Sequence, residues 1–326
     1  MIISRTPLRI TLGGGGTDLP SFYEREGGLV LSAAINRYIY VMLNRTFSGD
    51  YLLKYSALER VSRVDDIQHP IIRAALRRHD VGPALELVSV ADIPAGTGLG
   101  SSGAFTVGLL KALYSFKREH AVASAIAEEA CDIEIHDLNR PVGKQDQYIA
   151  AVGGVTEFGI AKDGRVAIKA LDISNETRHD LEEHLLLFFT GYARDADAVL
   201  EDQRSRSSAG DEGMIANLRY VKELGQATKV ALEAGKTREF AELMDLHWAH
   251  KQERSKGMSS PSINRWYELG KASGAIGGKL VGAGAGGFLL FYTLAPADLR
   301  KVMVAEGLAE VRFSFDHDGT ALVARD

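Results

Sequence analysis

Cysteine is nearly absent from this sequence: Cys131 is the only one among 326 residues. A disulfide framework needs at least two cysteines, and no spacing of Cys and His residues resembles a zinc ligand set. An excess of positive charge is also missing, because 38 Lys and Arg residues face 43 Asp and Glu residues, for a net charge of −5. Nucleic-acid-binding surfaces are typically basic, so we expect no nucleic-acid partner.

Long apolar runs are lacking as well. The longest one, residues 280–295, is interrupted by glycines and is too short to span a bilayer. Near the N-terminus, Arg5 and Arg9 interrupt the apolar stretch, which is unlike a cleavable signal. We therefore expect a cytoplasmic protein without a membrane partner. The chain is long enough for one large domain or two smaller ones.

Glycine, in contrast, is abundant and clustered. The 34 glycines are about 10% of the chain, against a usual ~7%. Most fall in three clusters, at residues 13–16, 96–103 and 277–287. Flexible linkers mix glycine with serine and lack flanking apolar segments. These clusters instead lie between regular segments, which predicts places where the backbone approaches a ligand or another backbone closely.

The pattern of apolar residues predicts a mixed α/β protein. We expect strands at 1–12, 28–35, 37–45, 84–90, 184–190 and 287–293, a hairpin at 153–160 and 166–171, and one or two strands within 310–323. We expect helices at 101–116, 121–138, 195–206, 211–234, 237–251 and 261–273. The β-rich first part and the helical second part predict two domains, 1–172 and 173–326.

The second glycine cluster follows a predicted strand and opens a predicted helix at Ser101. Free backbone N–H groups and the positive end of the helix dipole attract an anion at such a turn, which predicts a phosphate site. The hydroxyls of Ser101 and Ser102 can cap the helix or bind a cation. The alternative is a turn whose small residues only allow a helix to pack closely on a strand.

Single motifs discriminate poorly here. Both 98–103 and 282–287 match the pattern G-x-G-x-x-G, but neither lies in the strand–helix–strand unit of a dinucleotide site. A Walker A motif is absent, because Gly143-Lys144 and Gly278-Lys279 are not followed by Ser or Thr. G-x-S-x-G, the serine-hydrolase motif, is absent too. These absences disfavour three common enzyme classes.

Three motifs together are specific. Residues 94–104, PAGTGLGSSGA, strongly resemble the phosphate-binding signature of the GHMP small-molecule kinases. Residues 7–18, PLRITLGGGGTD, are similar to the first motif of that family, and 279–287, KLVGAGAGG, to the third. The glycines before Thr17 and Asp18, together with 143–148, GKQDQY, resemble the branch that phosphorylates D-glycero-D-manno-heptose 7-phosphate.

The resemblance implies a mixed α+β and α/β architecture, with two domains and the active site in the cleft between them. It implies an ATP- and Mg²⁺-dependent sugar kinase that phosphorylates the anomeric 1-hydroxyl of the heptose 7-phosphate, for nucleotide-activated heptose and surface polysaccharide synthesis. The alternatives are L-fucokinase or another sugar 1-kinase of the superfamily, and a non-catalytic sensor of sugar or ATP on the same fold. The oligomeric state stays open.

The resemblance also assigns roles to residues. Asp146 matches the catalytic base, and Arg9 matches a cation that neutralises the transferred phosphoryl group or binds a substrate phosphate. Arg9 on an exposed edge strand is the alternative. The ATP phosphates are expected on the loop formed by Pro94, Gly96, Gly98, Leu99, Gly100, Ser101, Ser102 and Gly103.

Magnesium is expected on Ser102 and Glu134, while Glu128, Glu129 and Asp132 are expected on a solvated helix face. Substrate contacts are expected from Gly15, Gly16, Thr17, Asp18, Lys144, Arg194 and Gly284. Lys251 and Lys279 are further candidate cations of the cleft. We interpret His247, like the other histidines, as structural or surface-exposed, and Cys131 as a small buried side chain.

Overall fold

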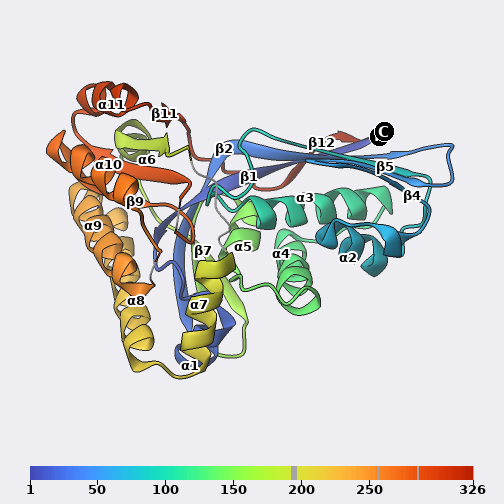
Figure 1. Ribbon diagram of the computed structural model, residues 1–326, viewed down its shortest axis with the longest axis horizontal. Coiled ribbons are helices and arrows are strands. Elements are labelled where there is room, and N and C mark those ends of the chain that lie inside the picture. The colour runs from blue at the N-terminus through green and yellow to red at the C-terminus, as the bar shows by residue number, and fades with distance from the viewer. Residues whose placement is uncertain (192–196, 256, 285, 326) are drawn as a thin grey trace.

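The computed structural model describes residues 1–191, 197–255, 257–284 and 286–325 (Figure 1). Its larger sheet has the strand order β12-β1-β2-β5-β3-β4, and β6 and β7 extend it from β2. These strands are β1 (Ile2–Gly13), β2 (Gly28–Arg45), β3 (Tyr51–Lys54), β4 (Leu58–Val61), β5 (Leu85–Ala91), β6 (Val155–Ile160), β7 (Val166–Ala170) and β12 (Ala321–Arg325). All pairs are antiparallel except β3 with β5.

Strand β2 is continuous, so the two separate strands expected around residue 36 were wrong. Its first part, 28–33, pairs with β6, and its last part, 39–45, pairs with β5. Asn36 does not interrupt the strand, because its backbone N–H donates to the Ser314 carbonyl and its side chain accepts from the Ser314 N–H. One long strand thereby connects two parts of the sheet.

The second sheet is antiparallel, in the order β11-β8-β10-β9. Its strands are β8 (Leu185–Phe189), β9 (Ala275–Leu280), β10 (Phe288–Thr293) and β11 (Ala309–Glu310). Part of the third glycine cluster lies in β9, which the sequence pattern missed. A Cβ on Gly277 would lie 1.9 Å from the Ala241 carbonyl oxygen, so glycine is needed where β9 meets helix α9 (Thr237–Arg254).

Helices cover both sheets. Figure 1 shows α2 to α5 along one face of the larger sheet and α9 to α11 around the second sheet. The remaining helices are α1 (Pro20–Glu26), α2 (Pro70–Arg78), α3 (Ser101–Phe116), α4 (Ala123–Cys131), α5 (Gln145–Val152), α6 (Asn175–His184), α7 (Asp197–Ser208), α8 (Glu212–Glu233), α10 (Pro261–Ala272) and α11 (Pro296–Ala305), with a 3₁₀ turn at Val64–Asp66. Within the described residues, no helix combines the length and the apolar character needed to cross a membrane.

The C-terminal strand returns to the first sheet. Strand β12 pairs with β1, with Arg325 opposite Ile2, and Phe315 forms a bridge to Ile35. The main buried apolar cluster also joins the two parts of the chain, since it contains Leu8 as well as Phe288. The division into 1–172 and 173–326 stays a prediction, and it leaves β12 on the sheet of the first part.

Candidate active site

Both parts of the chain line a cavity of about 980 Å³. This volume is in the upper range of small-molecule sites. Of the residues predicted from the sequence, thirteen line it: Arg9, Gly15, Gly16, Asp18, Pro94, Gly96, Gly98, Gly100, Ser101, Ser102, Asp146, Lys251 and Lys279. The structure therefore brings together the first glycine cluster, the loop after β5 and the start of α5.

The loop from β5 to α3 has the backbone expected of an anion site. Gly96, Gly98 and Gly100 have positive φ angles of 75°, 84° and 77°. Gly100 is the N-cap of α3 and offers no side-chain acceptor, and no acidic residue lies in the first turn. The first N–H groups of the helix are thereby left for an anion.

The same loop also packs closely on the third glycine cluster. A Cβ on Gly98 would lie 2.6 Å from the Val281 carbonyl oxygen, and a Cβ on Gly282 would lie 2.5 Å from the Gly98 Cα. The close-packing alternative therefore describes the structure too, alongside the phosphate site. The two glycine-rich loops support each other at the cavity wall.

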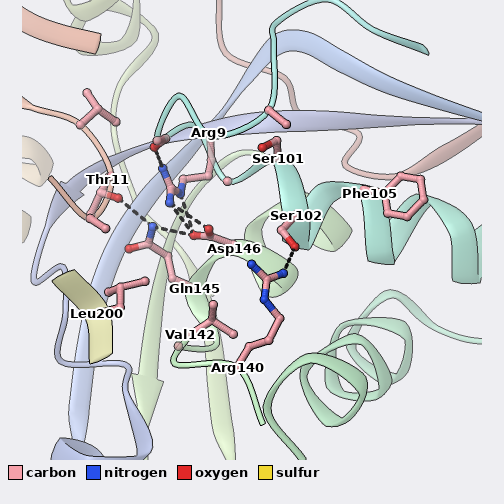
Figure 2. A pocket seen from close by; sticks show the side chains of 18 of the residues that line it. Arg9, Thr11, Ser101, Ser102, Phe105, Arg140, Val142, Gln145, Asp146 and Leu200 are labelled. Carbon is pink, nitrogen blue, oxygen red and sulfur yellow. Dashed lines mark hydrogen bonds and ion pairs between the residues drawn. The ribbon is translucent and has the colours of Figure 1, made fainter. Parts of the chain in front are cut away.

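Arg9 and Asp146 form a paired group beside this loop (Figure 2). The Arg9 Nε donates to Asp146 Oδ1 at 2.8 Å, and Arg9 Nη2 donates to Oδ2 at 2.9 Å. Arg9 Nη1 donates to the Gly98 carbonyl. Arg9 is 6% exposed on β1, which lies between β12 and β2, so the edge-strand alternative was wrong. The bidentate contact fixes the Asp146 carboxylate relative to the loop.

Two neighbours complete this arrangement. The Gln145 amide nitrogen donates to Thr11 Oγ1 at 2.7 Å and to Asp146 Oδ1 at 3.2 Å. Gly103 does not line the cavity, but a Cβ there would lie 2.7 Å from the Asp146 Cβ. Glycine is therefore required for α3 to approach α5. Thr11 and Gln145 were not predicted as site residues, although they lie within the family motifs at 7–18 and 143–148.

Glu134 lies behind Ser102 rather than on the cavity wall. Ser102 Oγ donates to Glu134 Oε2 at 2.5 Å. Arg140 Nη1 donates to Ser102 Oγ and to Glu134 Oε2. The other carboxylate oxygen, Oε1, accepts from Thr106 Oγ1 at 3.2 Å and Gln147 Nε2 at 2.9 Å. The Glu134 side chain is completely buried, and this burial raises its pKa. Arg140 was not predicted from the sequence.

A change of helix type positions Glu134. The helix predicted over 121–138 is α-helical only to Cys131 and continues as a π-helical turn over 132–137. π turns often occur at functional sites. Glu128 pairs with Lys144 but is 44% exposed, whereas Glu129 bonds to His79 and is 15% exposed. The solvated face expected for these residues was therefore wrong for Glu129.

Asp18 follows the first glycine cluster and accepts hydrogen bonds from two backbone N–H groups. Its Oδ1 accepts from the Gly16 N–H at 3.2 Å, and its Oδ2 accepts from the Gln145 N–H at 3.1 Å. A Cβ on Gly143 would lie 2.0 Å from Asp18 Oδ2, so only glycine fits there. Burial raises the pKa of Asp18, with a smaller contribution from the charge of Asp146. Asp18 faces the cavity and fixes the loop at the same time.

Several predicted contacts lie elsewhere. Lys144 is not on the cavity wall: its ammonium donates to Glu128 at 2.6 Å and to the Gly164 carbonyl at 2.9 Å. Thr17 is fully buried, and its hydroxyl donates to the Gly14 and Leu29 carbonyls. The structure thus gives Lys144 and Thr17 structural contacts instead of a place in the cavity.

Two further predicted residues, Leu99 and Gly284, also lie away from the cavity. Leu99 is buried, and its carbonyl accepts from the Arg9 backbone N–H at 3.0 Å. Gly284 lies outside the cavity lining and next to Met258, whose sulfur would be 2.4 Å from an added Cβ. Arg194 falls outside the described residues.

Four basic side chains from α9 and β9 line the cavity, and we call them the cation cluster: His247, Lys251, Arg254 and Lys279. Arg254 reaches the first glycine cluster, and Lys251 donates to the Gly282 carbonyl beside the glycine loop. None is more than 7% exposed. Burial lowers the pKa of each, to about 10 for Arg254 and about 7 for Lys279. His247, interpreted from the sequence as structural or surface-exposed, is buried and lines the cavity. Positions 247, 251 and 254 recur on one face of α9, and this spacing was the signal in the sequence.

The comparisons agree with this geometry. The family models described as GHMP kinases N terminal domain and GHMP kinases C terminal match residues 67–154 and 228–307. The chain is 31% identical to D-glycero-alpha-D-manno-heptose 7-phosphate kinase of Campylobacter jejuni, over 98% of this chain and 97% of that one. It is 26% identical to L-fucokinase/L-fucose-1-P guanylyltransferase of Bacteroides fragilis, over 93% of this chain and 36% of that protein.

A solved structure shows the same fold. The crystal structure of a D-glycero-D-manno-heptose 1-phosphate kinase from Bacteroides thetaiotaomicron superimposes with a TM-score of 0.82, at 24% identity, and covers 100% of both chains. The predicted two-domain fold with mixed sheets and helices is thereby confirmed. The chain belongs to the GHMP kinases, a family of ATP-dependent phosphotransferases.

Proposed function

We propose that this protein transfers the γ-phosphoryl group of ATP to the anomeric 1-hydroxyl of D-glycero-D-manno-heptose 7-phosphate. The product would be the precursor of a nucleotide-activated heptose, and the need for ATP places the reaction in the cytoplasm. The full-length similarity to a heptose 7-phosphate kinase supports the substrate. The observation that carries the chemistry is the Asp146 carboxylate, held by Arg9 beside the glycine loop in one cavity.

The glycine loop would hold the triphosphate. Phosphoryl transfer depends on positioning and on neutralisation of charge, because the protein forms no covalent bond to the phosphoryl group. The N–H groups at the start of α3 supply fixed donors without a side-chain cation. We assign the β- and γ-phosphates to residues 96–102, with Pro94 and Gly103 supporting the loop.

Asp146 would act as the base. It would accept the proton of the sugar hydroxyl as the hydroxyl oxygen attacks the γ-phosphorus. Arg9 holds the carboxylate through two hydrogen bonds, at 2.8 and 2.9 Å, and also reaches the Gly98 carbonyl of the phosphate loop. One guanidinium thus connects the base to the loop, and its charge lies where the transferred group would pass.

Ser102 and Glu134 offer the kind of oxygen ligands that a magnesium ion prefers. Mg²⁺ prefers one or two protein oxygens together with phosphate oxygens and water. The Ser102 hydroxyl lies 2.5 Å from the Glu134 carboxylate. The Arg140 guanidinium bonds to both groups, which supports a cation site at this pair. When bound, Mg²⁺ would neutralise charge on the β- and γ-phosphates.

The sugar would lie over the first glycine cluster. Gly15, Gly16 and Asp18 line the cavity, and Asp18 shares hydrogen bonds with the Gln145 backbone next to the base. A carboxylate that already accepts two backbone hydrogen bonds keeps further lone pairs for sugar hydroxyls. Arg194, outside the described residues, stays a predicted substrate contact.

An assay coupled to ADP release tests the proposal. Heptose 7-phosphate, L-fucose and galactose are offered separately with ATP and Mg²⁺, and we expect turnover with the heptose 7-phosphate. Turnover with fucose alone would transfer the assignment to the fucokinase alternative. ATP binding without turnover of any sugar would favour the sensor, and mass spectrometry of the product checks that the new phosphate is at position 1.

A further inference from the structure

The cation cluster is unbalanced in charge. Its positive side chains lie at 2–7% exposure, where an unpaired charge is costly. The only carboxylates that line the cavity in the described part of the chain are Asp18, Asp92 and Asp146. Asp146 pairs with Arg9, and Asp92 accepts from the Tyr38 N–H. Asp18 alone is left to balance the cluster, and it acts on Arg254.

The cluster is held by uncharged acceptors. Lys279 Nζ donates to the Leu12 carbonyl at 3.1 Å, and Lys251 Nζ donates to the Leu280 carbonyl at 3.2 Å. The Arg254 guanidinium donates to Asn217 at 3.1 Å and to Gly15 at 3.3 Å. Throughout the described residues, no carboxylate forms an ion pair with these three cations.

Some buried polar atoms have no partner among the described residues. Arg254 Nη2 and both ring nitrogens of His247 lack a hydrogen-bond partner there, although they are buried. Buried polar groups in folded proteins are nearly always hydrogen-bonded, so each exception needs an explanation. The unpaired atoms and the excess charge lie at the wall of one cavity, and a multivalent anion with several oxygens would satisfy both.

The cluster borders the sugar end of the cavity. Arg254 contacts Gly15 and lies so close to Gly16 that an added Cβ there would be 2.5 Å from its Nη1. His247 lies 4.0 Å from the position of a Cβ on Gly15, and Lys279 bonds to Leu12 at the start of this segment. Lys251 alone reaches toward the glycine loop, since it also donates to the carbonyl of Gly282, which packs against Gly98.

We propose that His247, Arg254 and Lys279 bind the phosphate group that the sugar substrate already carries, with Lys251 on the side of the glycine loop. This inference rests on the proposed function and specifies it: the substrate class is a phosphorylated sugar, recognised through its dianion, and an unphosphorylated sugar leaves the cluster unbalanced. The chemistry recognised is a phosphate, which either the sugar phosphate or ATP could supply, and the test distinguishes the two.

Steady-state kinetics with Arg254→Met distinguish these sources. We expect the KM for heptose 7-phosphate to rise about 10- to 100-fold, as for the loss of hydrogen bonds to a charged group, while the KM for ATP stays within about twofold. Arg254→Lys should recover part of the loss. Arg238→Met is the matched control, because Arg238 lies on the same helix but is exposed and paired with Glu242.

The outcomes separate this inference from the proposed function. A rise in the KM for ATP with an unchanged KM for the sugar phosphate would overturn the inference, and so would equal efficiency of the wild type on heptose and heptose 7-phosphate. If the wild type turns over no heptose 7-phosphate, the proposed function fails, and calorimetric titration with inorganic phosphate still decides the inference. If Arg254→Met abolishes phosphate binding and Arg238→Met preserves it, the inference is supported. If the wild type and both variants bind phosphate equally, the inference is rejected.

Discussion

The two ends of the cavity offer positive potential in different ways. At one end, residues 96–102 present backbone N–H groups at the start of α3, with glycines whose φ angles are positive. At the other end, the cation cluster presents buried side-chain charges from α9 and β9. Backbone donors require no desolvation of a full charge, whereas buried cations raise the free energy of the empty site.

The two kinds of donor therefore suit different phosphate groups. Fixed backbone dipoles suit a group that reacts and leaves, because they are already oriented and need not reorganise as its charge changes. Buried cations suit a group that must be recognised, because their unpaired state penalises any ligand without the matching charge. Asp146 is held by Arg9 next to the glycine loop (Figure 2).

The largest expected effect comes from the residue between the two ends. Asp146→Asn keeps the size of the side chain but removes the proton acceptor. We expect kcat to fall about 10²- to 10⁴-fold, the usual contribution of a general base. The ADP-release assay measures kcat, and calorimetry with a non-hydrolysable ATP analogue should show retained nucleotide binding.

Asp163→Asn is the control for this substitution, because Asp163 pairs with Arg165 on the surface. Its kcat should equal that of the wild type. A kcat near the wild-type value in Asp146→Asn would show that the loop end works without this base.

Glu134→Gln addresses the metal at the loop end. It keeps the shape of a fully buried side chain but removes the charge behind Ser102. We expect the concentration of Mg²⁺ needed for half-maximal activity to rise about 10- to 100-fold. Magnesium-dependent binding of the ATP analogue, measured by calorimetry, should weaken in parallel. Equal Mg²⁺ dependence in wild type and variant would remove Glu134 from the metal site.

Gly98→Ala tests the loop itself. An alanine would need a positive φ of 84°, and its Cβ would lie 2.6 Å from the Val281 carbonyl oxygen. We expect a loss of about 1–2 kcal/mol in the free energy of unfolding, with a higher KM for ATP. Gly49→Ala is the control, since nothing lies within 4 Å of its added Cβ. Equal denaturant midpoints for the two variants would contradict the close-packed loop.

The smallest effect concerns the pH dependence of the cation end. Burial lowers the pKa of Lys279 from 10.5 to about 7 in the folded protein. Below pH 7 the group is charged in both states, and its burial costs stability. Between pH 7 and 10.5 the unfolded chain binds the proton that the folded protein has lost, so stability rises with pH.

Lys279→Met should remove this contribution. Urea titrations at pH 7 and pH 9 measure the free energy of unfolding of both proteins. We expect the wild type to gain stability relative to Lys279→Met as the pH rises. A constant difference between the two would show that Lys279 keeps an ordinary pKa.

The same contrast explains what the sequence could predict. The loop end is contiguous: a strand, a glycine cluster and a helix starting at Ser101 are adjacent in the chain, and α3 begins there in the structure. The pairing of Arg9 with Asp146 joins residues 137 positions apart, and only the family motifs placed them in one site.

The sequence predicted Lys251 and Lys279 as cations of the cleft, but it placed neither His247 nor Arg254 beside them, because packing builds this group. Lys251 and Lys279 come from α9 and β9, and their meeting depends on the close contact of Gly277 with α9. Likewise, Lys144 is adjacent in sequence to the motif of the base, but its side chain points to Glu128. Adjacency in the chain does not fix side-chain direction, which is set by burial and available partners.

A crystal structure with Mg²⁺, a non-hydrolysable ATP analogue and heptose 7-phosphate tests the two-ended cavity most directly. We expect the triphosphate on the backbone N–H groups of residues 96–102, the sugar phosphate at Arg254, and the 1-hydroxyl within hydrogen-bond distance of Asp146. A triphosphate bound at Arg254, or a 1-hydroxyl remote from Asp146, would contradict it.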